Sequence, residues 1–211
     1  MPILIDKTVA RNSRLLVWKV TEPLEFLLTG IKLNDRSKSR FEAMKSEAHQ
    51  CTFLSVRQLL SAAGYTDFDL FYDAFGKPNL RNGKHISISH SHHFAAIIIS
   101  DIIVGIDLEW AREKIIRIAK KFAVTEMPFL ETQPEHNLIH MLTVIWGVKE
   151  SIFKIRNEPG ISFKDHLSVL PFELRQKYAT GKLHFGSVNV NFDVHFEIIE
   201  EFVLVYAFPS N

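Results

Sequence analysis

Cysteine is almost missing from this chain, which contains Cys51 and no other cysteine among its 211 residues. One cysteine excludes an intramolecular disulfide, and such usage is typical of a reducing compartment. Long apolar runs are missing too: the stretches 94–99 and 102–106 are far shorter than the ~20 residues of a membrane-spanning helix. The N-terminal ten residues have no basic start of a signal peptide. We therefore expect a cytoplasmic protein that does not cross a membrane.

An excess of charge of one sign is also lacking. The chain has 25 Lys and Arg against 24 Asp and Glu, which gives a formal net charge of +1. No overall field then attracts nucleic acid or a membrane surface, so neither is expected as a partner, and any basic binding surface must be local. The length and the 46% hydrophobic content allow one larger domain or two compact halves.

The apolar spacing indicates a mixture of helices and strands. Helices are predicted where apolar residues recur at helical spacing, at 41–63, 67–73, 112–122 and 134–156. Strands are predicted in alternating or β-rich stretches, at 85–89, 94–100, 102–109, 182–192, 194–199 and 202–208. Because helix-then-strands occurs twice, we expect an α+β fold of two similar halves, residues 1–101 and 102–211.

Two acidic residues follow each other at strand spacing in the segment Gly-Ile-Asp-Leu-Glu-Trp, residues 105–110. On a strand, Asp107 and Glu109 point to one face and Ile106 to the other. Gly105 allows a close approach of another backbone or of a ligand. Neighbouring carboxylates repel each other unless they are solvated, protonated or hold a cation. An exposed acidic strand end is the alternative interpretation.

A second group lies on the predicted helix 134–156. Trp146, Glu150 and Lys154 are spaced four residues apart and share one face of that helix. A surface ion pair worth ~0.3–0.5 kcal/mol is the alternative interpretation. The large apolar Trp146 on the same stripe indicates that this face packs against other parts of the protein.

Taken together, the two segments supply three carboxylates and a lysine. Oxygen ligands suit Mg²⁺, which binds through a few carboxylates together with substrate phosphates. A lysine near such an ion is suited to stabilising the negative charge of a phosphoryl group. A zinc site is a less favoured hypothesis that would draw on the histidines at 85, 90, 92 and 93.

Five short motifs occur in a fixed order: Gly-Lys-Pro at 76, Ser-His-Ser at 89, Gly-Ile-Asp-Leu-Glu-Trp at 105, Phe-Ala-Val-Thr-Glu at 122 and Trp-Gly-Val-Lys-Glu-Ser-Ile-Phe-Lys at 146. This order resembles the Sfp-type 4′-phosphopantetheinyl transferases. The resemblance implies two α+β halves related by a pseudo-twofold axis, with the active site at their interface. It also implies transfer of the phosphopantetheine arm of coenzyme A to a serine of an apo carrier protein, with release of 3′,5′-ADP.

The resemblance assigns roles to the residues of the C-terminal half. It places Asp107, Glu109 and Glu150 on the metal-ligand positions for Mg²⁺. Glu150 is also the implied base for the serine hydroxyl, and Lys154 the implied contact to the phosphates of coenzyme A. Glu126, Trp146 and Lys149 stand at motif positions whose roles are less direct.

The N-terminal half is implied to contribute coenzyme A contacts. Lys77 and Pro78 fall on the adenine side, and Ser89 and His90 fall on the pair that contacts the phosphates.

The segment 36–51 departs from the family pattern, because Gln50 and Cys51 stand where an arginine and a threonine are common. Arg40 and Lys45 are among the residues that could hold the 3′-phosphate instead; the alternative is a solvated basic stretch.

Two other functions stay open: a catalytically silent relative that binds coenzyme A or a carrier, and a Mg²⁺-dependent nucleotide pyrophosphatase. The sequence does not specify which carrier is modified. Carrier proteins present their serine on an acidic helix, so a basic or apolar groove must receive it, and we expect this groove near residues 123–135. By resemblance, the protein works as a monomer.

Overall fold

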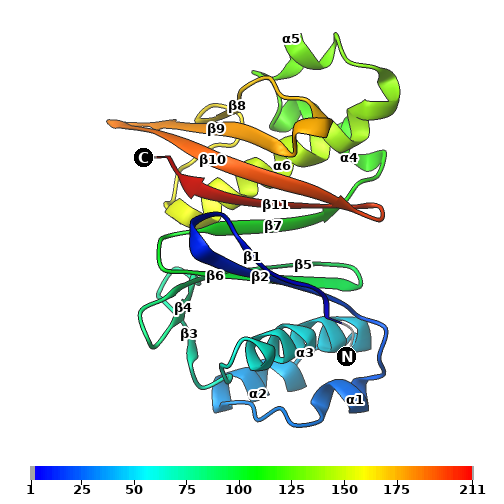
Figure 1. Ribbon diagram of the computed structural model, residues 1–211, viewed down its shortest axis with the longest axis vertical. Helices are drawn as coiled ribbons and strands as arrows, with labels where there is room; N and C mark the ends of the chain where they lie inside the picture. The colour runs from blue at the N-terminus through cyan, green and yellow to red at the C-terminus, as the bar shows by residue number, and fades with distance from the viewer. Residues whose placement is uncertain (1–2, 211) are drawn as a thin grey trace. The chain divides into compact units, whose positions relative to one another are not determined.

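The computed structural model describes residues 3–210, and the chain divides after Ile102 into two compact units, residues 1–102 and 103–211. Each unit combines one antiparallel sheet with a long helix that covers one face of that sheet (Figure 1). The expected α+β class with two halves is therefore confirmed. The pseudo-twofold relation and an active site between the halves stay predictions.

The N-terminal unit is built on an antiparallel six-stranded sheet in the order β1-β2-β6-β5-β4-β3. Its strands are β1 (Ile3–Val9), β2 (Ser13–Lys19), β3 (Leu70–Tyr72), β4 (Pro78–Leu80), β5 (His85–Ser91) and β6 (Phe94–Ser100). Its helices are α1 (Leu24–Leu28), α2 (Asp35–Glu42) and α3 (Glu47–Ala62). The long helix α3 packs on β2 and β6, where Leu54 and Leu59 join Leu16 and Ile97 in one buried cluster. Cys51 is buried in the same cluster, as a small apolar residue of the α3 stripe.

A buried polar network fixes α2 against α3. The Arg57 guanidinium pairs with Asp67 at 3.0 Å, and both side chains are almost fully buried. Asp67 also accepts hydrogen bonds from the Ser37 hydroxyl and the Asn34 backbone N–H, while the Asn34 side chain caps α2. Because a buried charge must be paired, this network holds the start of α2 in one place.

The C-terminal unit is built on an antiparallel five-stranded sheet in the order β7-β11-β10-β9-β8. Its strands are β7 (Gly105–Trp110), β8 (Leu167–Val169), β9 (Tyr178–Phe185), β10 (Val188–Ile199) and β11 (Phe202–Pro209). Its helices are α4 (Lys114–Ile118), α5 (Met127–Leu130) and α6 (Glu135–Arg156). Single 3₁₀ turns occur at Ala10–Asn12 in the first unit and at Ala119–Lys121 and Leu174–Gln176 in the second.

Glycines allow α6 to lie unusually close to the sheet. A Cβ on Gly105 of β7 would lie only 2.0 Å from the backbone oxygen of Ser151 on α6. A Cβ on Gly147 of α6 would lie 2.6 Å from the side chain of Val205 on β11. The expectation that Gly105 serves a close approach is confirmed, and the approaching group is the α6 backbone. These contacts place β7 directly under the helix (Figure 1).

Several predicted elements are wrong or shifted. Residues 67–73 do not form a helix, because Leu70–Tyr72 alternates between buried and exposed and pairs with β4. Helix 41–63 is interrupted at residues 43–46 and starts again after Ser46. The strand predicted at 182–192 is divided by a turn at the positive-φ Gly186, so its first residues end β9 and its last residues begin β10. Strand β10 then continues without a break through the strand predicted at 194–199. The first seventeen described residues, for which no element is predicted, contain β1 and β2.

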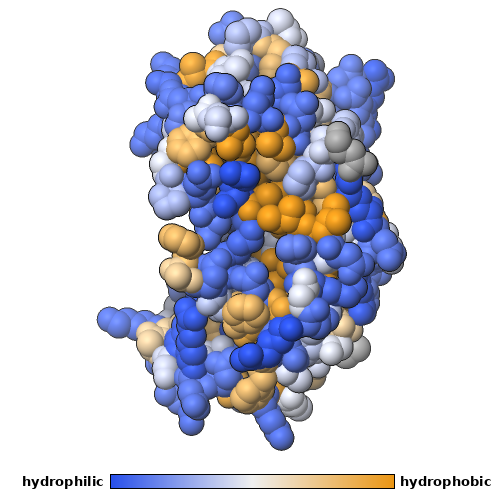
Figure 2. Space-filling view, turned by 90° about the vertical axis from the view of Figure 1, so that its left-hand side faces the viewer, coloured by the Kyte–Doolittle hydropathy of each residue, from blue (hydrophilic) through white to orange (hydrophobic). Residues whose placement is uncertain are grey.

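The surface is largely polar with scattered apolar groups. Figure 2 shows broad hydrophilic areas that separate smaller hydrophobic patches on the face in view. Phe75 is the most exposed large apolar side chain recorded, at 70%. Within residues 3–210, no helix has the length and the apolar character that a membrane span requires.

The glycine contacts predict a graded loss of stability in two alanine variants. Gly105→Ala should lower the free energy of unfolding by about 3 kcal/mol, because the added methyl meets rigid helix backbone. Gly181→Ala, whose methyl would meet the mobile tip of Ile152 at 2.5 Å, should cost about 1 kcal/mol. Urea denaturation followed by circular dichroism measures both, and equal losses would contradict this account of the packing.

Candidate functional site

Asp107 and Glu109 lie on the face of the sheet that α6 covers. Their partners across the strand pair are Val205 and Val203 of β11, and both valines belong to the core beneath α6. Residues directly opposite each other on neighbouring strands share a face, so the two carboxylates point toward the helix. Asp107 is buried, whereas Glu109 near the strand end is half-buried.

Lys154 reaches from α6 to the first of these carboxylates. Its Nζ lies 2.8 Å from Asp107 Oδ1 and also donates a hydrogen bond of 2.8 Å to the backbone oxygen of Ile106. The Lys154 side chain keeps 29% of its surface exposed, while Asp107 keeps 5%. One end of this ion pair is therefore fixed within the protein, and the lysine remains accessible from solvent.

Glu150, one turn before Lys154, has an unusual protonation equilibrium. Burial, followed by the nearby charge of Asp107, raises the pKa of Glu150 to about 7. Lys154 opposes this shift, and Glu109 adds to it. The pKa of Glu150 thus reflects the charges of Asp107 and Glu109, with Lys154 as an opposing charge.

The residues present fit a hard divalent cation. Their donors are carboxylate oxygens, and the charges of Asp107 and Glu109 add to the effect of burial in raising the pKa of Glu150. Within the described residues 3–210, no three His, Cys, Asp or Glu side chains are close enough together to hold a metal by themselves. A cation at this position would therefore also need ligands from outside the protein. The histidines between 85 and 93 form no such group either.

A second lysine of the same helix has a different environment. Lys149 is fully buried, and its Nζ lies 2.9 Å from the equally buried Glu126 carboxylate. The same Nζ donates to the backbone oxygens of Phe122 and Phe163, and Glu126 accepts from the Val169 N–H. Burial lowers the pKa of Lys149, and Glu126 opposes this effect. The pairing itself was not predicted, although both residues stand at motif positions.

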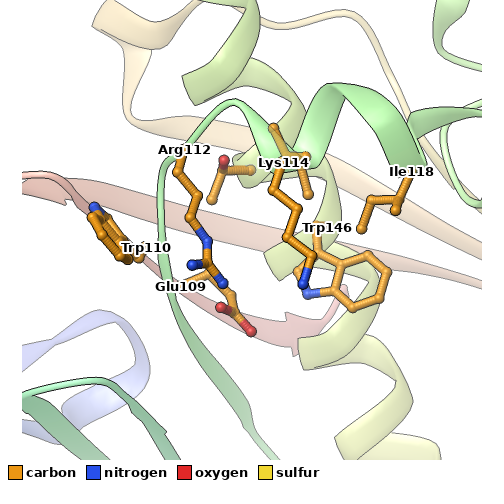
Figure 3. Close-up of a pocket in the computed structure, with 8 residues that line it drawn as sticks. Glu109, Trp110, Arg112, Lys114, Ile118 and Trp146 are labelled. Carbon is orange, nitrogen blue, oxygen red and sulfur yellow. The ribbon is translucent and has the colours of Figure 1, made fainter.

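Two cavities adjoin the carboxylates, and both are lined by Ile118 and Trp146. The smaller one, of about 160 Å³, lies beside Glu109, and Figure 3 shows Arg112 and Lys114 extending toward Glu109 and Trp146. The other, of about 430 Å³, lies beside Glu150 and is also lined by Lys121, Phe122 and Phe163. The predicted groove segment 123–135 lines neither of these two cavities.

The other predicted site residues belong to the N-terminal unit. Lys77 closes a turn in which Asp73 accepts its N–H, and Pro78 begins β4. Ser89 and His90 are neighbours on β5, so their side chains point to opposite faces of the sheet. Ser89 is buried and His90 is exposed. Contacts of these residues with coenzyme A stay predictions.

Arg40 and Lys45 lie at the end of α2 and in the connection to α3. Arg40 lines a small recess together with Arg36 and Arg57, and its guanidinium lies over the Phe53 ring at 5.7 Å. Because Asp67 already balances Arg57, the other two arginines give the recess a positive character. Lys45 does not line this recess.

Comparisons with known proteins agree with the motifs. Residues 103–206 match the family described as the 4′-phosphopantetheinyl transferase superfamily. The matched residues comprise β7, α6 and the whole carboxylate site. The predicted resemblance is therefore confirmed at the level of the superfamily.

Two individual relatives are similar to parts of this chain. The 4′-phosphopantetheinyl transferase gsp of Aneurinibacillus migulanus is 33% identical over 81 residues, which are 38% of this chain and 34% of that relative. The crystal structure of the Thermotoga maritima holo-acyl-carrier-protein synthase AcpS gives a TM-score of 0.40 at 17% identity, over 52% of this chain and 64% of that one. The chain thus spans about a third of the curated relative that it matches.

The raised pKa of Glu150 predicts a pH-dependent effect of Glu150→Gln on stability in the absence of metal. The stability that protonated Glu150 provides is present below its ordinary pKa of 4.5 and is lost as the pH rises through about 7. Glutamine mimics the protonated form, so the variant should match wild type at pH 4 and exceed it at pH 8 by about 1–3 kcal/mol.

Urea denaturation with EDTA at both pH values measures this effect. The exposed Glu131→Gln is the matched control and should change stability equally at the two pH values. Equal stability of wild type and Glu150→Gln at pH 8 would contradict the charge repulsion described above.

Proposed function

We propose that this protein transfers the 4′-phosphopantetheine arm of coenzyme A to a serine hydroxyl of an apo carrier protein and releases 3′,5′-ADP. The supporting observation is the group formed by Asp107, Glu109, Glu150 and Lys154, which lies within the part of the chain that matches the superfamily. We further propose that the enzyme is of the Sfp type and works as a cytoplasmic monomer.

Asp107, Glu109 and Glu150 would hold Mg²⁺ in this proposal. When bound, the ion supplies positive charge that offsets the charge developing on the pyrophosphate. The fit rests on the oxygen-only donor set and on its excess of negative charge. Because the carboxylates form no complete cage by themselves, phosphate oxygens and water would supply the remaining ligands.

Glu150 would act as the general base, and Lys154 would stabilise negative charge on the phosphate. A positioned carboxylate can act as a general base when it is ionised, and a cation bound at this site would favour the ionised form of Glu150. Glu150 would accept the proton of the carrier serine hydroxyl as the serine oxygen attacks the pyrophosphate of coenzyme A, from which 3′,5′-ADP leaves. Lys154 is anchored at the Ile106 oxygen and partly exposed, so its ammonium group can donate hydrogen bonds to a phosphate.

The N-terminal unit would hold the nucleotide end of coenzyme A. Lys77 and Pro78 would contact the adenine, and His90 or Ser89 the phosphates. Arg40, beside Arg36 in a positive recess, and Lys45 would hold the 3′-phosphate.

The acidic carrier would dock beside the carboxylate site. Arg112 and Lys114 border one cavity and Lys121 the other, which provides a basic margin around the apolar Trp146. An acidic helix with an apolar contact residue complements such a surface.

Mass spectrometry of carrier proteins tests the activity directly. Purified protein with Mg²⁺ and coenzyme A should add one phosphopantetheine arm to at least one member of a panel of apo carriers. Glu150→Gln and Lys154→Met should each lower the rate by about 100-fold or more, since each removes a group that acts in the transition state. The exposed Glu25→Gln should retain the wild-type rate, and EDTA should abolish transfer.

The other two candidate functions appear as distinct outcomes of the same assay. Binding of coenzyme A with no mass gain in any carrier indicates the silent relative. Cleavage of coenzyme A without an acceptor indicates the nucleotide pyrophosphatase. Either result contradicts the proposed transfer.

Calorimetry tests the assignment of the 3′-phosphate. Arg40→Ala and Lys45→Ala should each weaken coenzyme A binding by about 10-fold, because a charge-assisted hydrogen bond is lost. The same variants should bind 3′-dephospho-coenzyme A as wild type does, and Lys182→Ala on β9 is the control. An equal loss for both ligands would place these residues elsewhere on the ligand or in the fold.

A further inference from the structure

The cavity of about 430 Å³ beside Glu150 has aromatic walls that come from separate parts of the chain. Trp146 belongs to α6, Phe122 precedes α5 and Phe163 lies in the connection from α6 to β8. The Trp146 ring lies 5.1 Å from Phe122 and 5.5 Å from Phe163, between ring centroids. The shape of this cavity therefore depends on two segments that belong neither to the sheet nor to a long helix.

Lys149 connects those two segments to α6. Its Nζ donates hydrogen bonds to the backbone oxygen of Phe122 and, at 3.0 Å, to that of Phe163. The third partner is Glu126, at 2.9 Å, whose other contact is the Val169 N–H at 2.8 Å. The buried ammonium group of Lys149, the residue just before Glu150, thus fixes the backbone of both aromatic walls.

Stability alone does not explain a charged pair at this position. Replacing a buried ion pair by apolar residues of similar volume is often neutral or stabilising, because desolvation offsets the attraction of the charges. An apolar side chain, however, could not direct hydrogen bonds to the oxygens of Phe122 and Phe163 at once. What the pair adds is the defined position of these two backbone segments.

We propose that Lys149 and Glu126 are a positioning pair, which sets the places of Phe122 and Phe163 and thereby the alignment of the substrate group that enters the cavity beside Glu150. Lys149 acts through protein groups, since its side chain is fully buried and its three ammonium hydrogens are directed to Glu126 and to the backbone oxygens of Phe122 and Phe163. This inference rests on the proposed function for the nature of the substrate and goes beyond it in assigning the pair a role in the reaction.

Three variants separate positioning from simple stabilisation: Lys149→Met, Glu126→Gln and the double variant. Each single change leaves one buried group without its partner, so the Tm should fall by about 5 °C or more. The double variant removes both charges while the amide introduced by Glu126→Gln can still accept from the Val169 N–H, so its Tm should return close to the wild-type value. Arg175→Met, which removes the exposed ion pair with Glu173, is the control and should leave both Tm and transfer unchanged.

Activity should not follow stability in these variants. In the double variant we expect kcat to stay at least about 30-fold below wild type, because the two carbonyl hydrogen bonds are still missing. The Kd for coenzyme A should change by less than about threefold. Recovery of kcat together with Tm would show that the pair is only structural. A large loss of coenzyme A affinity in the well-folded double variant would show direct contact, and either result overturns the inference.

A measurement that does not depend on turnover also tests the positioning role of Lys149 and Glu126. It stays decisive even if the wild-type protein transfers nothing and the proposed function is wrong. In protein labelled with 5-fluorotryptophan, the ¹⁹F resonance of Trp146 should shift or broaden in the double variant, because its neighbours Phe122 and Phe163 move. The resonance of Trp18, buried in the other unit, should remain in place. An unchanged Trp146 resonance overturns the positioning role.

Discussion

The close contact between α6 and strand β7 is the constraint on which the C-terminal unit depends. Because Gly105 has no side chain, the α6 backbone at Ser151 can lie directly against the strand. Gly147 likewise leaves room for the side chain of Val205. At this separation Lys154 reaches Asp107 and the Ile106 oxygen. With larger residues at the two glycines, helix and strand would move apart, and the carboxylates would no longer influence one another across the gap.

Helix α6 shows how position separates two lysines of one motif. Lys149 and Lys154 are five residues apart, which turns their side chains well away from each other around the helix. Lys149 is directed into the core, where Glu126 and two carbonyl oxygens satisfy it. Lys154 is directed along the open side of β7, where part of its surface meets solvent. Chemically identical groups thus serve the architecture in one case and are accessible to ligands in the other.

Much of the local structure could be predicted from periodicity. Helix 134–156 was placed within one residue of α6, because its apolar stripe is long and a turn follows at Asn157. Short strands were harder to identify: β3 has three residues, too few to distinguish a period of two from one of 3.6. The start of α2 depends on the network around Asp67, which lies 33 residues away from Asn34 in the sequence.

By itself, the sequence determined the α+β class, the superfamily and the types of side chain that could bind a cation, because these depend on spacing and order along the chain. Only the tertiary structure decided which of these groups interact. It brought Lys154 to Asp107, gave Glu150 its unusual pKa through burial and neighbouring charge, and paired Lys149 with Glu126. The physical reason is that electrostatic energies depend on distance and desolvation, and neither is set until helix and sheet have packed together.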